Sequence, residues 1–191
     1  MVKKDQDERA VCAAECEEMM LKLERLTAED FAVVWEIMEE SFPVDERRNR
    51  GGQEEVLKNP YYHLYGYRQR KEVVAFLAVW EFDVFTFIEH FAVKQTYRNG
   101  GLGAELLGQL LERNHLPVIL EAEPPLGELQ ERRIRFYERN GFVLNPYEYV
   151  QPAMSAEGKK IPLDIMSYPR RLSVGEYETM RDILYRIVYH V

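Results

Sequence analysis

Three glycines, Gly100, Gly101 and Gly103, lie between an apolar stretch that ends at Val93 and a helix-forming stretch that begins near Ala104. Glycine allows a tight turn and leaves its backbone N–H group open to a ligand. The first N–H groups of a helix have no partner within the helix and carry the positive end of its dipole. A strand that enters a helix through such a turn therefore predicts an anion-binding site, most naturally for a pyrophosphate.

Along the chain, segments whose apolar residues have the spacing of a strand alternate with segments whose apolar residues have the spacing of a helix. A polar turn at Gln69–Glu72 marks a hairpin, whereas the later strands are separated by helices. The predicted strands are Leu21–Leu26, Tyr62–Arg68, Val73–Phe82, Phe85–Val93, Pro117–Glu123, Phe142–Val150 and Ile161–Tyr168. The predicted helices are Thr27–Ser41, a short helix that ends at Leu57, Gly101–Asn114, Leu126–Asn140 and Val174–Val188. This order predicts an α/β fold of the α+β type, with a central mixed sheet and helices on both of its faces.

The chain of 191 residues is long enough for one domain and too short for two of ordinary size. Residues 1–19 are rich in charge and poor in large apolar side chains, so we expect a helical or disordered extension there. We expect residues 20–191 to form a single domain that ends with a helix at about 174–188.

The net charge of −8, from 25 Lys and Arg against 33 Asp and Glu, argues against nucleic acid as a partner. It is better suited to a cationic or amine-bearing substrate. We expect no membrane association, since the sequence has no apolar run of the roughly 18 residues that a membrane span needs, and no signal peptide. Cys12 and Cys16 are too few for a disulfide framework or a four-ligand zinc site. A cytoplasmic protein without a metal is therefore expected.

The glycine turn does not match the dinucleotide fingerprint or the Walker pattern, because the glycine spacing and the Lys-Ser/Thr pair are missing. It does match Arg-x-x-Gly-x-Gly, at Arg98, Gly101 and Gly103. Residues 136–142 read F-Y-E-x-x-G-F. The two motifs in this order resemble the acetyl-CoA pyrophosphate motif and the downstream signature of the GNAT superfamily of N-acetyltransferases.

The resemblance covers roughly residues 21–168, and residues 41–48 resemble a bacterial subset of the family whose substrates are mostly unassigned. It implies transfer of acetyl from acetyl-CoA to a primary amine of a small molecule or peptide, by direct attack and without a metal. We expect a monomer or a homodimer. The alternative is a CoA-binding or protein-interaction module that has kept the fold and lost turnover.

The resemblance also assigns roles to particular residues. Tyr137 matches the family tyrosine that protonates the departing thiolate, and a phenol with a pKa near 10 can donate a proton at neutral pH. Arg133 stands where a small residue is common and could reach a CoA phosphate. The expected contacts of the pantetheine amides and the pyrophosphate are Phe91, Ala92, Val93, Arg98, Asn99, Gly100, Gly101, Leu102, Gly103 and Ala104.

Two glutamates are candidates for the base that takes the proton of the amine. Glu121 aligns with a strand position that supplies a glutamate base in ribosomal-protein acetyltransferases of this superfamily. Glu89 lies on the neighbouring predicted strand, close to the point where the two strands are expected to separate. We weigh the two equally. His90 should face away from Glu89 by strand alternation, which indicates a structural role.

Overall fold

The computed structural model describes residues 21–154 and 158–191. The expected N-terminal extension, with Cys12 and Cys16, lies outside the described residues. The strands form one sheet in the order β1-β2-β3-β4-β5-β8-β6, and β7 pairs with β8 beside this path. The strands are β1 (Glu24–Arg25), β2 (Tyr62–Gln69), β3 (Glu72–Glu81), β4 (Thr86–Val93), β5 (Val118–Ala122), β6 (Val143–Leu144), β7 (Tyr149–Gln151) and β8 (Ile161–Tyr168). All neighbouring strands are antiparallel except β4 and β5, so the predicted mixed sheet is confirmed.

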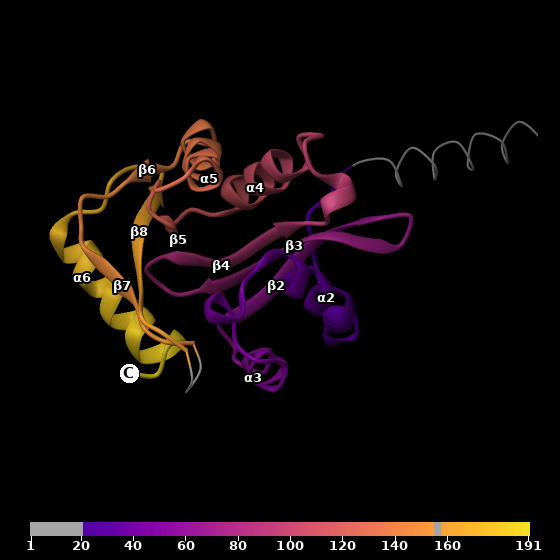
Figure 1. Ribbon diagram of the computed structural model, residues 1–191, viewed down its shortest axis with the longest axis horizontal. Coiled ribbons are helices and arrows are strands. Elements are labelled where there is room, and N and C mark those ends of the chain that lie inside the picture. Colours follow the sequence, from indigo (N-terminus) through magenta and orange to yellow (C-terminus); the bar gives the residue numbers. More distant parts are fainter. Residues whose placement is uncertain (1–20, 155–157) are drawn as a thin grey trace, which may run out of the picture.

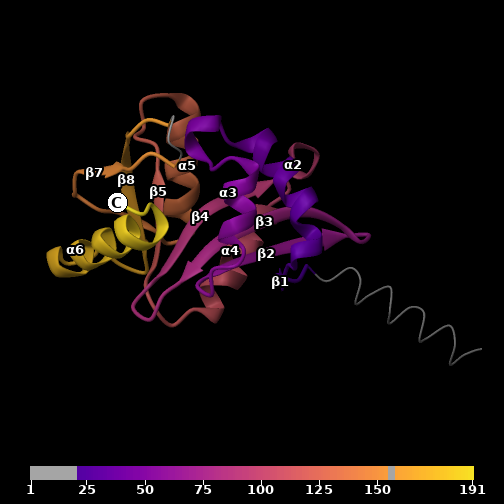
Figure 2. The ribbon, with the colours of Figure 1, turned by 90° about the horizontal axis from the view of Figure 1, so that it is seen from below.

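Helices cover both faces of the sheet, as predicted, with α4 and α5 on one side and α2 and α3 on the other (Figure 1). The α-helices are α2 (Phe31–Ser41), α3 (Arg50–Val56), α4 (Leu102–Arg113), α5 (Glu128–Arg139) and α6 (Val174–Ile183). Shorter 3-10 turns are η1 (Ala28–Asp30), η2 (Val44–Glu46) and η3 (Gln95–Tyr97). The views in Figures 1 and 2 both place α6 beside β7 and β8, at one end of the sheet.

Each face of the sheet carries its own apolar core. The α4/α5 face buries four leucines of α4 and Ile134 of α5 against the sheet. On the face that carries α2 and α3, residues of α6 join the same core, and we call it the α2/α6 face. It buries Trp35 and Met38 of α2 together with Met180 and Leu184 from the C-terminal region. A side chain of a central strand therefore points either into the core under α4 and α5 or into the core under α2 and α6.

Four predicted elements differ from the structure. The first strand is reduced to two residues, and the predicted helix after it starts as the 3-10 turn η1. The strand predicted over Phe142–Val150 is split into β6 and β7, because Pro146 between them has no N–H group to donate to β8. The terminal helix changes at Leu184 into a π-helical segment, η4 (Leu184–Val188), that ends the helix next to the sheet.

The centre of the sheet holds the irregularity that shapes the site. The strands β4 and β5 pair in parallel only over Thr86–Ile88 and Val118–Leu120, and they are unpaired beyond that point. The register between β3 and β4 shifts at Glu89, since Ala78 lies opposite His90 and Val79 lies opposite Ile88. Glu89 is thus the extra residue of a β-bulge, which bends the strand where the two strands part.

Candidate active site

The glycine turn and the first turn of α4 form one continuous surface of backbone N–H groups. Asn99 and Gly101 have positive φ angles of 67° and 83°, and α4 begins directly afterwards at Leu102. The first backbone bond of the helix is donated by the Glu105 N–H group to the Gly101 carbonyl, over 3.1 Å. The N–H groups of residues 102–104 therefore precede the helical hydrogen bonds and are available to an anion.

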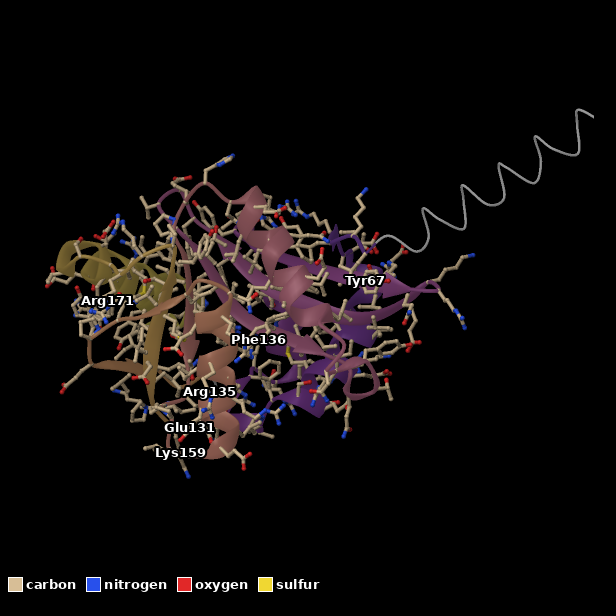
Figure 3. All side chains as sticks on the ribbon, turned by 90° about the horizontal axis from the view of Figure 1, so that it is seen from above. Tyr67, Glu131, Arg135, Phe136, Lys159 and Arg171 are labelled. Carbon is tan, nitrogen blue, oxygen red and sulfur yellow. The ribbon has the colours of Figure 1, made fainter. Side chains whose placement is uncertain are left out.

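Gly103 lies where this turn meets the rings of Phe91 and Phe136. A Cβ atom at Gly103 would lie 3.5 Å from the Phe91 ring and 3.7 Å from the Phe136 ring, which is ordinary contact. Packing alone therefore does not demand a glycine at this position. Figure 3 shows Phe136 on the side of α5 that faces α4. The glycine keeps the N-terminus of α4 bare between these rings.

The open edge of β4 carries backbone groups of the residues that were expected to pair with pantetheine. The Lys94 N–H group donates to the Val74 carbonyl over 2.8 Å, and Val93 lies opposite Ala75. In this antiparallel register the N–H and C=O groups of Ala92 point to β3, whereas those of Phe91 and Val93 point to the side where β5 has parted. Two of the three expected residues thus present their backbone groups to the place where β4 and β5 have parted, which we call the cleft.

Two arginines predicted to contact CoA are engaged within the fold. The Arg98 guanidinium donates to the Val93 carbonyl over 2.7 Å and to the Ser41 hydroxyl over 3.2 Å, and so fastens the glycine turn to β4 and α2. Arg133 forms an ion pair with Glu123, and its side chain is 41% exposed. Arg98 therefore shapes the turn, and Arg133 is held by Glu123 with part of its side chain in solvent.

The Glu121 carboxylate is enclosed by polar side chains of the C-terminal half. Its Oε2 atom accepts hydrogen bonds from the Tyr189 hydroxyl over 2.7 Å and from the Gln151 amide over 3.0 Å. Burial, together with the negative charge of Glu89, raises the pKa of Glu121 to about 7, although its hydrogen bonds act in the opposite direction. Glu121 is therefore a carboxylate that can exchange a proton near neutral pH.

Glu89 has the opposite electrostatic character. Burial would raise its pKa, but the Arg48 guanidinium, 2.7 Å away, and His90 hold the pKa at about 2. The prediction that His90 faces away from Glu89 is wrong, because the bulge interrupts the alternation. The imidazole lies 3.5 Å from the Glu89 carboxylate and packs edge-on against the Phe42 ring. Glu89 is a fixed negative charge in this arrangement.

Tyr137 enters from the other face of the sheet. It belongs to α5, and its ring packs edge-on against Phe136 and Phe142. Burial raises the pKa of its hydroxyl to about 12, so that the phenol holds its proton at neutral pH. Glu121 and Glu89 lie together on the α2/α6 face, and Tyr137 lies on the α4/α5 face.

Three partners of the two glutamates were missed by sequence reasoning, namely Arg48, Gln151 and Tyr189. Each contacts a glutamate at least 30 positions away along the chain, so a local pattern gives no signal for it. Among residues 21–154 and 158–191, no group of three or more His, Cys, Asp or Glu side chains is placed to hold a metal ion. The same residues include no helix with the length and apolar character to cross a membrane.

Comparisons with known proteins give matches to one family. A family model of the GNAT acetyltransferase domain matches residues 60–144, which include the bulge, the glycine turn and Tyr137. A solved structure from Bacteroides thetaiotaomicron that is assigned to the GNAT family of acetyltransferases is 32% identical, with a TM-score of 0.82. That match covers 89% of this chain and 99% of the other. No significantly similar sequence was found among curated proteins.

More distant structures share the fold. The ribosomal-protein-S18-alanine N-acetyltransferase from Escherichia coli is 19% identical with a TM-score of 0.58, covering 81% of this chain and 96% of the other. An aminoglycoside 6'-N-acetyltransferase complexed with coenzyme A is 15% identical with a TM-score of 0.58, covering 76% of this chain and 95% of the other. At these identities the likeness concerns the architecture of the chain.

Proposed function

Because the chain belongs to the GNAT family of acetyltransferases, we propose that this acetyl-CoA-dependent acyltransferase transfers acetyl to a primary amine of a small molecule or peptide. The proposal is carried by one juxtaposition. A carboxylate with a pKa near neutrality, Glu121, lies on β5 just beyond the last residue that pairs with β4. The bare N-terminus of α4 follows the end of β4 through the glycine turn.

The cleft residues hold acetyl-CoA through backbone groups. The N–H groups of residues 102–104 and of the glycine turn bind the pyrophosphate at the positive end of α4. The backbone of Phe91 and the Val93 N–H group pair with the pantetheine amides, in the manner of an added strand. Arg98 supports this site by holding the turn against the Val93 carbonyl.

Glu121 and Tyr137 supply the proton transfers from opposite faces of the sheet. The amine nitrogen attacks the thioester carbonyl, and its proton passes to the Glu121 carboxylate, directly or through water. The bond between carbon and sulfur then breaks, and the departing thiolate takes the proton of the Tyr137 hydroxyl. Glu89 stays ionised beside Arg48 and raises the proton affinity of Glu121 by its charge.

A cationic acceptor suits the charges at the cleft. Burial and the nearby charge of Glu123 raise the pKa of Glu46, whereas the Arg133 guanidinium, which pairs with Glu123, lowers it. Two carboxylates from separate segments thus already attract one guanidinium, and the ammonium group of an acceptor carries the same charge. Polyamines, aminoglycoside-like amines and the amines of peptides are acceptors of this kind.

The test is a panel of such amines with acetyl-CoA, read by release of free thiol. We expect at least one amine to accelerate thiol release far above the rate of hydrolysis, and mass spectrometry to show one acetyl group added to that amine. The Glu121→Gln protein is the control. Thiol release that no amine accelerates in the folded protein would contradict transfer to nitrogen.

A further inference from the structure

The last residues of the chain reach the carboxylate proposed as the base. Tyr189 follows η4, and its side chain is almost fully buried. Its hydroxyl donates to Glu121 Oε2 over 2.7 Å, although 68 positions separate the two residues. The C-terminal segment is thus in direct contact with the centre of the sheet.

Gln151 of β7 completes a closed set of hydrogen bonds with this pair. Its side-chain amide donates to Glu121 Oε2 over 3.0 Å and to the Tyr189 hydroxyl oxygen over 3.1 Å. The Tyr189 hydroxyl therefore accepts one hydrogen bond and donates another, so its proton is directed at Oε2. The second oxygen, Glu121 Oε1, is buried and accepts no hydrogen bond of good geometry from the described residues, although the Tyr149 hydroxyl is close enough to the carboxylate to lower its pKa.

The preceding residue is tied to the other glutamate. Arg48 donates one hydrogen bond to the Val188 carbonyl over 3.0 Å and another to Glu89 over 2.7 Å. Val188 is thereby connected to Glu89 through Arg48, and the next residue, Tyr189, contacts Glu121 directly. The segment is anchored at the two carboxylates by polar contacts as well as by packing.

The other tyrosines of the C-terminal region behave differently. The Tyr177 hydroxyl donates to the Glu148 carbonyl over 2.7 Å, and the Tyr185 hydroxyl donates to the Val150 carbonyl over 2.6 Å. Both therefore satisfy a backbone group of the β6–β7 region. Of these three tyrosines, Tyr189 alone donates to an ionisable side chain, so its contact is not the general way in which this region packs.

We propose that Tyr189 is a positioning residue that holds the Glu121 carboxylate through Oε2 and leaves Oε1 to accept the proton of the acceptor amine, directly or through water. This inference rests on the proposed function, in which Glu121 is the base. Tyr189 does not touch the substrate in this account. It acts through the orientation of Glu121.

The groups around Glu121 determine whether removal of the Tyr189 hydroxyl raises or lowers the pKa of Glu121. The ionisable groups that face it are Glu89 of β4, Tyr149 of β7, and Tyr185 and Tyr189 of the C-terminal region. Glu89 raises the pKa of Glu121, whereas hydrogen bonds donated to the carboxylate lower it. Removal of the Tyr189 hydroxyl should therefore raise the pKa of Glu121 further. A hydrogen bond to a charged group corresponds to a shift of about one pH unit or more.

The experiment compares Tyr189→Phe with Tyr177→Phe, which removes a hydroxyl from the same region without touching Glu121. Carbon-13 NMR of carboxyl-labelled glutamate, assigned with Glu121→Gln, follows the titration of Glu121 directly. The pH dependence of kcat/KM with one fixed amine follows catalysis. In Tyr189→Phe we expect the NMR midpoint and the acidic limb to move upward together by about one unit. Both should remain at the wild-type position in Tyr177→Phe.

An NMR midpoint in folded Tyr189→Phe that equals the wild-type midpoint would overturn the inference. A midpoint that moves while the acidic limb stays in place would support the contact between Tyr189 and Glu121 and would overturn Glu121 as the base. If Tyr189→Phe does not fold, Gln151→Met removes the other donor to Oε2 and should raise the same midpoint. An unchanged midpoint in that variant would count equally against the inference.

Discussion

Arg48 and Glu89 form an ion pair with an N–O distance of 2.7 Å, and their side chains are only 9% and 1% exposed. Removal of one member of such a pair leaves the other charge buried without compensation. We predict that Arg48→Met lowers the free energy of unfolding by about 3–5 kcal/mol at pH 7. Urea denaturation measures this loss. The double variant Arg48→Met/Glu89→Gln should recover much of it, and a double variant that is no more stable than the single one would contradict the pairing.

The ion pair of Arg48 and Glu89 also predicts that part of the free energy of unfolding is lost at acidic pH. The pKa of Glu89 is lowered from 4.5 to about 2, so its contribution is complete above pH 4.5 and is lost as the pH falls from 4.5 towards 2. Denaturation at several pH values should show a smaller loss of stability on acidification in Glu89→Gln than in the wild type. Equal slopes in the two proteins below pH 4.5 would show that Arg48 does not hold the Glu89 charge.

Glu121 predicts the opposite dependence of stability on pH, because its pKa is raised in the folded protein. Its pKa is raised from 4.5 to about 7, so ionisation costs stability as the pH rises from 4.5 to 7, and the cost is complete above 7. We expect Glu121→Gln to be more stable than the wild type by on the order of 3 kcal/mol at pH 8. At pH 4 the two proteins should be nearly equal. Thermal denaturation at both pH values checks this, and a glutamine variant that is less stable at pH 8 would contradict the burial of an ionised Glu121.

The glycine turn predicts a loss of acetyl-CoA binding without a loss of fold. The side chain of Gly103→Val would occupy the space beside Phe91 and Phe136 and would keep the pyrophosphate from the N-terminus of α4. Gly108→Val is the matched control, because it lies in the same helix and a Cβ atom there meets nothing within 4 Å. Calorimetry should show much weaker acetyl-CoA binding only for Gly103→Val. Equal affinities in the two folded variants would refute the position of the pyrophosphate.

Tyr137→Phe separates a chemical role from packing. The rings are almost equal in size, and a phenylalanine can keep the edge-on contacts with Phe136 and Phe142, so stability should change little. Loss of a general acid lowers turnover by about 10²–10⁴-fold. Acetyl-CoA affinity should be nearly unchanged, as measured by calorimetry beside steady-state rates. Wild-type turnover when chemistry is rate-limiting would remove Tyr137 from the mechanism.

The parts of the fold that local sequence determines were predicted closely. The strand Ile161–Tyr168 has the predicted bounds, and α4 begins within one residue of its predicted start, because the glycines define the turn before it. Gly141, with a positive φ of 87°, follows the end of α5 as expected for a C-terminal glycine. In these segments the structure follows from the spacing of apolar residues and from the glycines at the turns, and both are set by residues that are close together in the sequence.

The arrangement around the two glutamates could not be predicted in the same way. The bulge at Glu89 is a property of the pairing between β3 and β4, and it placed His90 on the face that strand alternation excluded. The choice between Glu89 and Glu121 depends on Arg48, which lies 41 positions away from Glu89 and lowers the pKa of that glutamate. Two equivalent glutamates in the sequence thus acquire pKa values of about 2 and about 7 only through tertiary contacts.

The pH dependence of acetyl transfer in wild type, Glu121→Gln and Glu89→Gln tests the account most directly. With one amine in all three proteins, wild type should show an acidic limb of kcat/KM with a midpoint near 7, the pKa of Glu121. Glu121→Gln should lose that limb and about 10²–10⁴-fold in rate. Glu89→Gln should keep the limb and move it to lower pH, since it removes a negative charge beside Glu121. A Glu121→Gln protein with the wild-type rate and the wild-type limb would contradict the account.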